Sequence, residues 1–103
     1  AMGLALTGDT LGAEQAEIWG LIWKCVDDDR LMPEAEALAA RFAAGPPLAY
    51  AAIKRSLHAS PHNTLAQQLD LERDTQAELG RSEDYREGVT AFMEKRPPVF
   101  KGK

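Results

Sequence analysis

The chain has 103 residues, so it forms at most one domain, and a domain of this size buries roughly two thirds of the surface that its unfolded chain exposes. Apolar residues make up 45% of the chain but aromatic residues only 7%, which favours a core of closely packed helices over one of bulky side chains. The net charge of −4 leaves no extended basic stripe, which argues against nucleic acid and against an anionic membrane as partners.

Three features bear on the compartment. No apolar run approaches the roughly 18 residues of a membrane span, and the N-terminus lacks the basic, apolar and small-residue pattern of a signal peptide. The single cysteine, Cys25, cannot form an intrachain disulfide, which agrees with a reducing environment. These features favour a cytoplasmic protein.

The first residues already have a helical pattern. Residues 1–6 lack an N-cap, and Thr7-Gly8 is typical of a helix end. We therefore expect the chain to begin inside an element, with Met2 not a natural start. The alternative is an alanine left by cloning in front of an initiator methionine.

A short helix and an extended segment are expected next. Residues 13–19 carry acids where the helix dipole favours them, and Gly20 follows as a helix end. Residues 21–26 form an apolar run rich in β-type residues and are followed by the acidic turn 27–29. They predict one brief extended, partly buried segment in which Cys25 is a small core residue.

Proline and glycine residues mark the next two helices. Pro33 suits the first position of a helix, and Gly45 ends it. Pro46-Pro47 then forces a corner, and a further helix runs from Leu48 to about Ser60-Pro61.

The last two helices have side-chain caps in the sequence. Thr64 with Gln67 three residues later predicts a capping box for a longer helix that ends at Gly80. Ser82 caps the final helix, which the prolines at 97–98 terminate. The predicted fold class is all-α, with several short helices and the single extended segment at 21–26.

The final helix carries the pair of residues with the most functional interest. Its inner stripe is Tyr85, Val89 and Phe92, and Lys95 lies about 60° around the helix from Phe92. An aromatic ring beside a cation suits a ligand that bears phosphates and an adenine ring. The alternative, which spacing alone favours, is a core phenylalanine beside a solvated lysine.

Glu72 interrupts the apolar face of the helix that follows Thr64. Burial of an unpaired carboxylate costs several kcal/mol, so Glu72 must have a partner. One interpretation is a catalytic acid with a raised pKa. The favoured one is an ion pair or hydrogen bond to an arginine, lysine or tyrosine, within the domain or across an oligomer interface, because no second acid, histidine or nucleophile falls near Glu72 in the pattern.

Catalytic and metal-binding patterns are not evident in the sequence. His58 and His62 have helical metal-pair spacing, but Ser60-Pro61 interrupts the helix and no third ligand is evident, so no metal site is predicted. Cys25 has no histidine near it in sequence, which favours an inert thiol. No glycine-rich phosphate loop or nucleophile elbow occurs. The chain can therefore at most complete a site whose chemistry lies elsewhere.

Segments along nearly the whole chain carry a family resemblance. They are residues 4–8, 13–16, 19–22, 44–47, 54–55, 69–72 and 82–100. The closing pattern Glu-Gly-x-x-Ala-Phe-x-Glu-Lys-Arg-x-Pro-x-Phe, at 87–100, is the most specific of them. Together they resemble the C-terminal third of the enoyl-CoA hydratase/isomerase (crotonase) family. Residues 19–26 and 81–88 look most like the family members that isomerise ring-epoxidised phenylacetyl-CoA in phenylacetate breakdown.

The resemblance implies an enzyme with two parts, an N-terminal spiral of β-β-α turns and a helical region that makes trimer contacts. Residues 1–103 match only the helical region, and the spiral catalytic domain is absent from this chain. The family's oxyanion-hole amides and catalytic carboxylates belong to the spiral, so the resemblance implies no catalytic residue here. The chain alone is expected to be inactive. The alternative is a stand-alone helical oligomerisation module of the same ancestry.

The resemblance also implies binding roles. Phe92 and Lys95 match the positions that approach the coenzyme A of a bound thioester, and Glu72 and Gln76 match a polar pair with a structural or interface role. The implied partners are an acyl-CoA substrate and other copies of the chain, in a trimer or hexamer. Coenzyme A enters as part of the substrate, so no separate cofactor is expected. Neither the acyl group nor the choice between hydration and isomerisation follows from the sequence.

Overall fold

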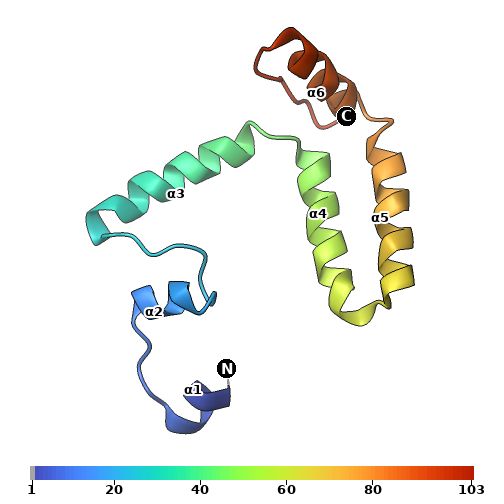
Figure 1. Cartoon of the computed structure of the whole chain (residues 1–103). Helices are drawn as coiled ribbons and strands as arrows, with labels where there is room; N and C mark the ends of the chain where they lie inside the picture. The colour runs from blue at the N-terminus through green and yellow to red at the C-terminus, as the bar shows by residue number, and fades with distance from the viewer. Residues whose placement is uncertain (1) are drawn as a thin grey trace. The chain divides into compact units, whose positions relative to one another are not determined.

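The computed structural model describes residues 2–103 and divides the chain into two compact units, one ending at Ala37 and the other running from Leu38 to Lys103. Over the described residues the secondary structure is helical, with six α-helices, one 3₁₀ turn and no strand (Figure 1). The predicted all-α class is confirmed. Among these helices, none has both the length and the apolar character that crossing a membrane requires.

The first unit begins with two short helices, α1 (Met2–Thr7) and α2 (Ala13–Ile18). Helix α2 ends as the sequence predicts, because Gly20 adopts a left-handed φ of 70°. That conformation lets Gly20 N–H donate to the Glu17 carbonyl at 2.9 Å and Leu21 N–H donate to the Ala16 carbonyl at 2.8 Å. Glycine is the residue that adopts this conformation without a Cβ clash.

The apolar run 21–26 does not form a strand. Residues 21–23 are bends and residues 24–27 have no regular structure, because a single segment without a ladder partner cannot be stable as a strand. Leu21 and Trp23 are 68% and 74% exposed, and Cys25 is half-buried rather than in the core.

Helix α3 (Asp28–Ala43) begins five residues before the predicted start at Pro33. Asp28 and Asp29 occupy its first turn, where carboxylates interact favourably with the helix dipole. Pro33 lies inside the helix and cannot donate a backbone hydrogen bond there. The ion pairs of Glu34 with Lys24, at 2.8 Å, and with Arg30, at 3.2 Å, add support to this region.

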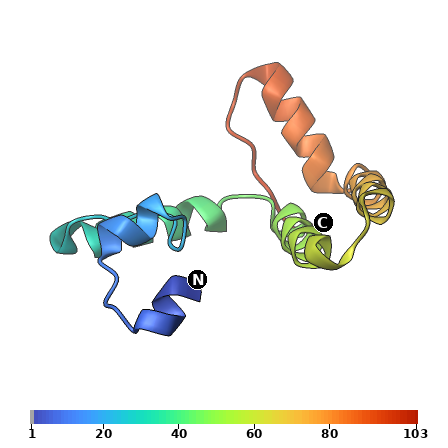
Figure 2. The ribbon, with the colours of Figure 1, turned by 60° about the horizontal axis from the view of Figure 1, so that its bottom comes forward.

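The second unit contains a helical hairpin of α4 (Pro47–Ala59) and α5 (Leu65–Leu79), joined by the 3₁₀ turn η1 (Ser60–His62) (Figure 2). The predicted capping box is confirmed: Gln67 N–H donates to Thr64 Oγ1 at 3.3 Å, and Thr64 N–H donates to Gln67 Oε1 at 2.8 Å. The two helices are linked through Gln68, whose Nε2 donates to Ser56 Oγ at 3.0 Å.

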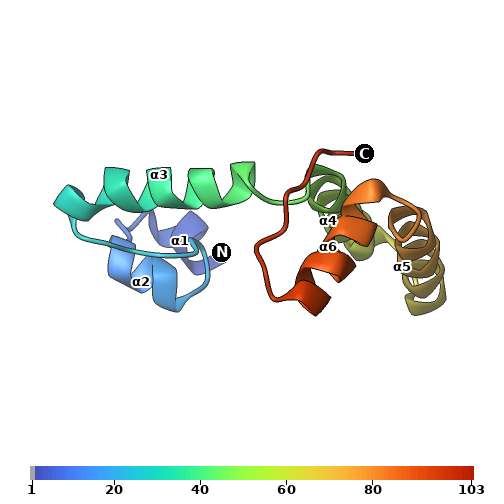
Figure 3. The same cartoon turned by 90° about the horizontal axis from the view of Figure 1, so that it is seen from above.

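Helix α6 (Glu83–Glu94) follows α5 and leads into a C-terminal tail, residues 95–103. The tail reverses direction after α6 and returns toward the start of α4 (Figure 3). A Cβ built on Gly102 would lie 3.0 Å from Pro47 Cγ, so the tail approaches the first turn of α4 closely. Within the second unit, the chain after α4, α5 and α6 thus folds back on these helices.

Candidate functional site

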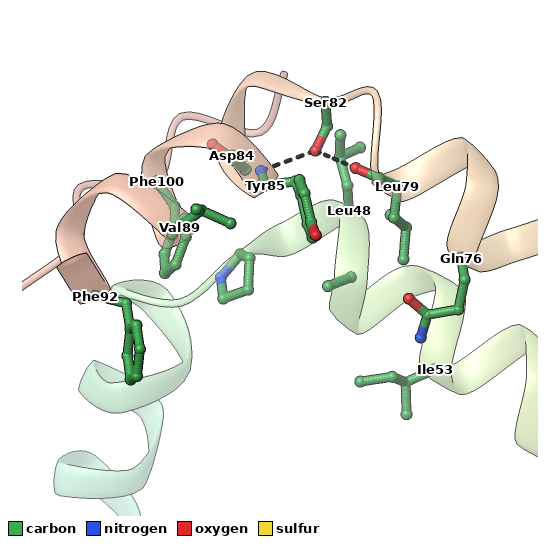
Figure 4. Close-up of a pocket in the computed structure, with 13 residues that line it drawn as sticks. Leu48, Ile53, Gln76, Leu79, Ser82, Asp84, Tyr85, Val89, Phe92 and Phe100 are labelled. Atoms are coloured by element: carbon green, nitrogen blue, oxygen red, sulfur yellow. Dashed lines mark hydrogen bonds between the residues drawn. The ribbon is translucent and has the colours of Figure 1, made fainter.

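The first turn of α6 is fixed by Ser82. Ser82 Oγ accepts a hydrogen bond from Tyr85 N–H at 3.0 Å and donates one to the Leu79 carbonyl at 2.7 Å (Figure 4). The predicted N-cap is confirmed. Since the same hydroxyl contacts the end of α5 and the start of α6, it fixes the corner between the two helices.

Asp84 joins the start of α6 to the end of the chain. Its side chain is only 5% exposed, and its two carboxylate oxygens accept hydrogen bonds from Lys101 N–H at 2.7 Å and Gly102 N–H at 2.9 Å. Asp84 N–H donates to the Lys103 carbonyl at 3.0 Å. Sequence analysis missed this residue, because an acid in a first helical turn is already explained by the helix dipole.

The other end of α6 is an unusual turn at Lys95. Its φ of 54° and ψ of 39° place Lys95 in the left-handed region, where a residue with a Cβ costs about 1–2 kcal/mol. Lys95 N–H donates to the Phe92 carbonyl at 3.3 Å, and Arg96 N–H donates to the Ala91 carbonyl at 3.0 Å. These two bonds satisfy helix-terminal carbonyls in the way that usually requires glycine at this position.

Arg96 and Glu87 hold the tail against α6. Arg96 Nη1 lies 2.6 Å from Glu87 Oε1 and Nη2 lies 3.0 Å from Oε2, which is a bidentate pair. Glu87 Oε1 also accepts a hydrogen bond from Val99 N–H at 2.8 Å, and Arg96 Nε donates to Glu94 Oε2 at 2.6 Å. The Arg96 guanidinium, followed by the Val99 N–H, lowers the pKa of Glu87 to about 2. The same carboxylates raise the pKa of Arg96.

We expect Glu87→Gln to destabilise the protein at neutral pH but not at very low pH. Because the pKa of Glu87 is lower in the folded state, at about 2 against a reference of 4.5, its contribution is present above pH 4.5 and is lost as the pH falls through about 2. The measurement is the urea midpoint of wild type and variant at a series of pH values. A difference between them that persists unchanged at the lowest pH would contradict this assignment.

An open apolar pocket of about 460 Å³ lies between α4, α5, α6 and the tail (Figure 4). Its lining includes the predicted inner stripe of α6, with Tyr85 54%, Val89 48% and Phe92 82% exposed. Phe100 of the tail completes one side, in contact distance of a Cβ built on Gly88. The stripe therefore faces an open pocket within the second unit, and over residues 2–103 Phe92 is exposed rather than part of a closed core.

Lys95 lies just beyond the pocket residue Phe92 in the chain. It is exposed, and because it has left the helical conformation, the helical offset of about 60° from Phe92 does not apply. None of the ion pairs found over residues 2–103 includes Lys95, whereas its neighbour Arg96 is bonded to two carboxylates. The structure thus leaves the Lys95 ammonium available to an external anion.

Glu72 and Gln76 lie on the α5 side of the hairpin. Within residues 2–103, Glu72 Oε1 accepts a hydrogen bond from Gln68 Nε2 at 2.9 Å, and no arginine, lysine or tyrosine of this part of the chain bonds to it. A partner across an oligomer interface stays a prediction. Glu72 is also exposed rather than buried, because this face of α5 is open to solvent over the described residues. Gln76 lines the apolar pocket.

Three residues for which the sequence predicts no catalytic or metal-binding role are His58, His62 and Cys25. His58 lies in the last turn of α4 and His62 ends η1. Across residues 2–103 there is no group of three or more histidine, cysteine, aspartate or glutamate side chains arranged to hold a metal ion. Cys25 lies in the irregular segment after α2.

The helical fold and the pattern at residues 87–100 are those of one class of protein, which comparison with known proteins identifies. The family model "Enoyl-CoA hydratase/isomerase" matches residues 1–103, and the chain belongs to this family. It is 53% identical over 103 residues to the Escherichia coli protein named 1,2-epoxyphenylacetyl-CoA isomerase, with all of this chain and 39% of that protein covered. It is 50% identical, also over 103 residues and the whole chain, to a Rhodobacter capsulatus protein named "Probable enoyl-CoA hydratase", of which 40% is covered.

Solved structures agree with this assignment. The structure of an enoyl-CoA hydratase from Mycobacterium marinum matches 99% of this chain and 40% of its own chain, with a TM-score of 0.88 and 37% identity. One from Geobacillus kaustophilus matches 94% of this chain and 38% of its own, with a TM-score of 0.87 and 39% identity. The chain thus spans about two fifths of the length of the relatives that it matches.

Proposed function

We propose that the protein acts on acyl-CoA thioesters as an enoyl-CoA hydratase or isomerase, and that residues 1–103 form its C-terminal helical region. The family membership supports the substrate class. The 53% identity to a 1,2-epoxyphenylacetyl-CoA isomerase favours isomerisation of that aromatic thioester, while the 50% identity to a protein named for hydration makes hydration the competing activity. In this proposal the region binds coenzyme A and contributes to subunit assembly.

The observation that carries the coenzyme A role is that Lys95, which has no ion-pair partner among residues 2–103, follows the exposed pocket residue Phe92 by three positions in the chain. Coenzyme A presents phosphate oxygens and an adenine ring, and a lysine ammonium stabilises a phosphate through a charge-assisted hydrogen bond. Phe92, at 82% exposed, offers an aromatic surface to the organic part of the ligand. Arg96 is less suited to this role, because its guanidinium is already bonded to Glu87 and Glu94.

The proposal gives this region a binding role and assigns it no catalytic residue. Stabilising a thioester oxyanion requires preorganised hydrogen-bond donors, and moving a proton at the acyl group requires a base within hydrogen-bond reach. The polar groups that contact one another here, such as Asp84 with the tail and Glu87 with Arg96, are engaged in holding α6. We therefore place the reacting groups outside residues 1–103, so that this region alone would not turn over substrate.

Assembly is supported by apolar side chains that the second unit leaves exposed. Leu65 is 77% exposed, Met93 75% and Leu57 67%. Exposed apolar side chains of this size can be buried in a protein–protein interface. We propose that copies of the protein cover it in a homo-oligomer.

We expect Lys95→Ala to weaken the affinity for coenzyme A about tenfold, the loss of one charge-assisted contact to phosphate. The measurement is calorimetric titration of coenzyme A into the protein as its gene encodes it and into the variant. Lys54→Ala, which removes another exposed lysine from α4, is the matched control and should retain wild-type affinity. Unchanged affinity in Lys95→Ala would remove Lys95 from the coenzyme A site.

A further inference from the structure

The turn that carries Lys95 is held by charges on both sides. Residue 94 before it and residue 96 after it are themselves ion-paired, at 2.6 Å between Arg96 Nε and Glu94 Oε2. The second carboxylate on Arg96 comes from Glu87, almost two helical turns earlier on α6. The left-handed Lys95 is therefore flanked by residues that are bonded to one another, since Arg96 after it is paired with Glu94 and Glu87 of α6.

Glu87 connects the tail back to α6. Its carboxylate accepts hydrogen bonds from both terminal nitrogens of Arg96, at 2.6 and 3.0 Å, and from the backbone N–H of Val99, at 2.8 Å. Its side chain is 25% exposed, which is the lowest exposure among the partners of Arg96. A bidentate arginine–carboxylate pair fixes orientation as well as distance, and a lysine in place of Arg96 could not reproduce it.

The left-handed conformation needs such support, because a lysine does not prefer it. If residues 94–96 relaxed to a right-handed or extended conformation, the direction in which the Lys95 side chain leaves the end of α6 would change. Two backbone bonds, from Lys95 and Arg96 to the Phe92 and Ala91 carbonyls, favour the turn. The Glu87–Arg96 pair holds Arg96, the residue immediately after Lys95.

We propose that Glu87, acting through Arg96, is a positioning residue that fixes the turn from which the Lys95 ammonium reaches the phosphates of a coenzyme A thioester. This inference rests on the proposed coenzyme A role of Lys95 and adds a residue that does not itself touch the ligand. It assigns the strained turn at Lys95 a binding purpose, since lysine supplies a charge that glycine would lack.

The test is a double-mutant cycle on coenzyme A affinity, measured by calorimetry in the protein as its gene encodes it. We expect Glu87→Gln to weaken binding about threefold and Lys95→Ala about tenfold, with the double variant no weaker than Lys95→Ala alone. The slope of log Kd against log salt concentration should decrease in both single variants, because both lose the same phosphate contact. A purely structural role of Glu87 would not produce this coupling.

Two further variants keep the result interpretable. Arg96→Lys retains the charge but loses the bidentate geometry, so we expect it to weaken coenzyme A binding about as much as Glu87→Gln does. It therefore tests the positioning role even if Glu87→Gln folds poorly. Asp70→Asn breaks the exposed Arg73–Asp70 ion pair on α5, at 2.7 Å, and should bind coenzyme A as wild type does. Circular dichroism verifies the helix content of each variant.

The possible failures are distinguishable. Wild-type affinity in Lys95→Ala would overturn the proposed coenzyme A role itself. Weakened binding in Lys95→Ala with wild-type affinity in Glu87→Gln and Arg96→Lys would overturn only the positioning role. Additive losses in the double variant would also overturn it, because Glu87 would then act independently of Lys95.

Discussion

Ala52→Asp is expected to lower the free energy of unfolding by about 3–5 kcal/mol, the cost of a buried charge without a partner. Ala52 is 2% exposed on α4 and borders a pocket shared with Glu72 of α5. An aspartate there would lose its hydration and would also lie near a like charge. Urea denaturation of wild type and variant measures the difference.

The adjacent residue provides the control. Ala51 lies on the same helix but is exposed, so Ala51→Asp has the same helix propensity cost without the burial. We expect it to change the free energy of unfolding by about 0.5–1 kcal/mol. Equal destabilisation by the two substitutions would show that Ala52 is not part of the packed contact between α4 and α5.

Asp84→Ala is expected to lower the free energy of unfolding by about 2–3 kcal/mol, because two backbone donors lose a charged acceptor. The donors are Lys101 N–H and Gly102 N–H, at 2.7 and 2.9 Å. The substitution should also release the tail, so hydrogen exchange of these two amides should accelerate by more than exchange in α5.

The control for Asp84 is an acid of the same type in an exposed position. Asp74 on α5 has a 69% exposed side chain and pairs with Arg73 at the surface. Asp74→Ala should therefore have little effect on stability, as exposed ion pairs usually contribute little. A fully protected tail in Asp84→Ala would mean that other contacts, such as Glu87 with Val99, are sufficient to hold it.

The proposed coenzyme A binding depends on whether the apolar stripe of α6 is accessible to a ligand. Within the second unit the stripe of Tyr85, Val89 and Phe92 lines a pocket rather than a closed core. A pocket with this apolar lining accommodates an apolar ligand part or a partner's side chains, while a cation just beyond it can contact an anion. This arrangement agrees with a region that binds one end of a thioester and leaves the reaction to other residues.

The sequence determined the features that depend on neighbours within a few residues. The capping box of Thr64 and Gln67, the N-cap at Ser82 and the glycine turn at Gly20 are local hydrogen-bond patterns, and the structure contains each of them. The all-α class follows from the same local signals. Segments along nearly the whole chain, of which the pattern at 87–100 is the most specific, indicated the family, and the family model matches residues 1–103.

Only the tertiary structure decided the contacts between residues far apart in the chain. The pairing of Asp84 with residues 101–102, the Glu87–Arg96 pair and the left-handed turn at Lys95 depend on the tail folding back along α6. The irregular 21–26 segment and the exposure of Glu72 likewise depend on which elements lie nearby. Local propensity cannot predict these features, because their free energy comes from partners that the chain brings together only when it folds.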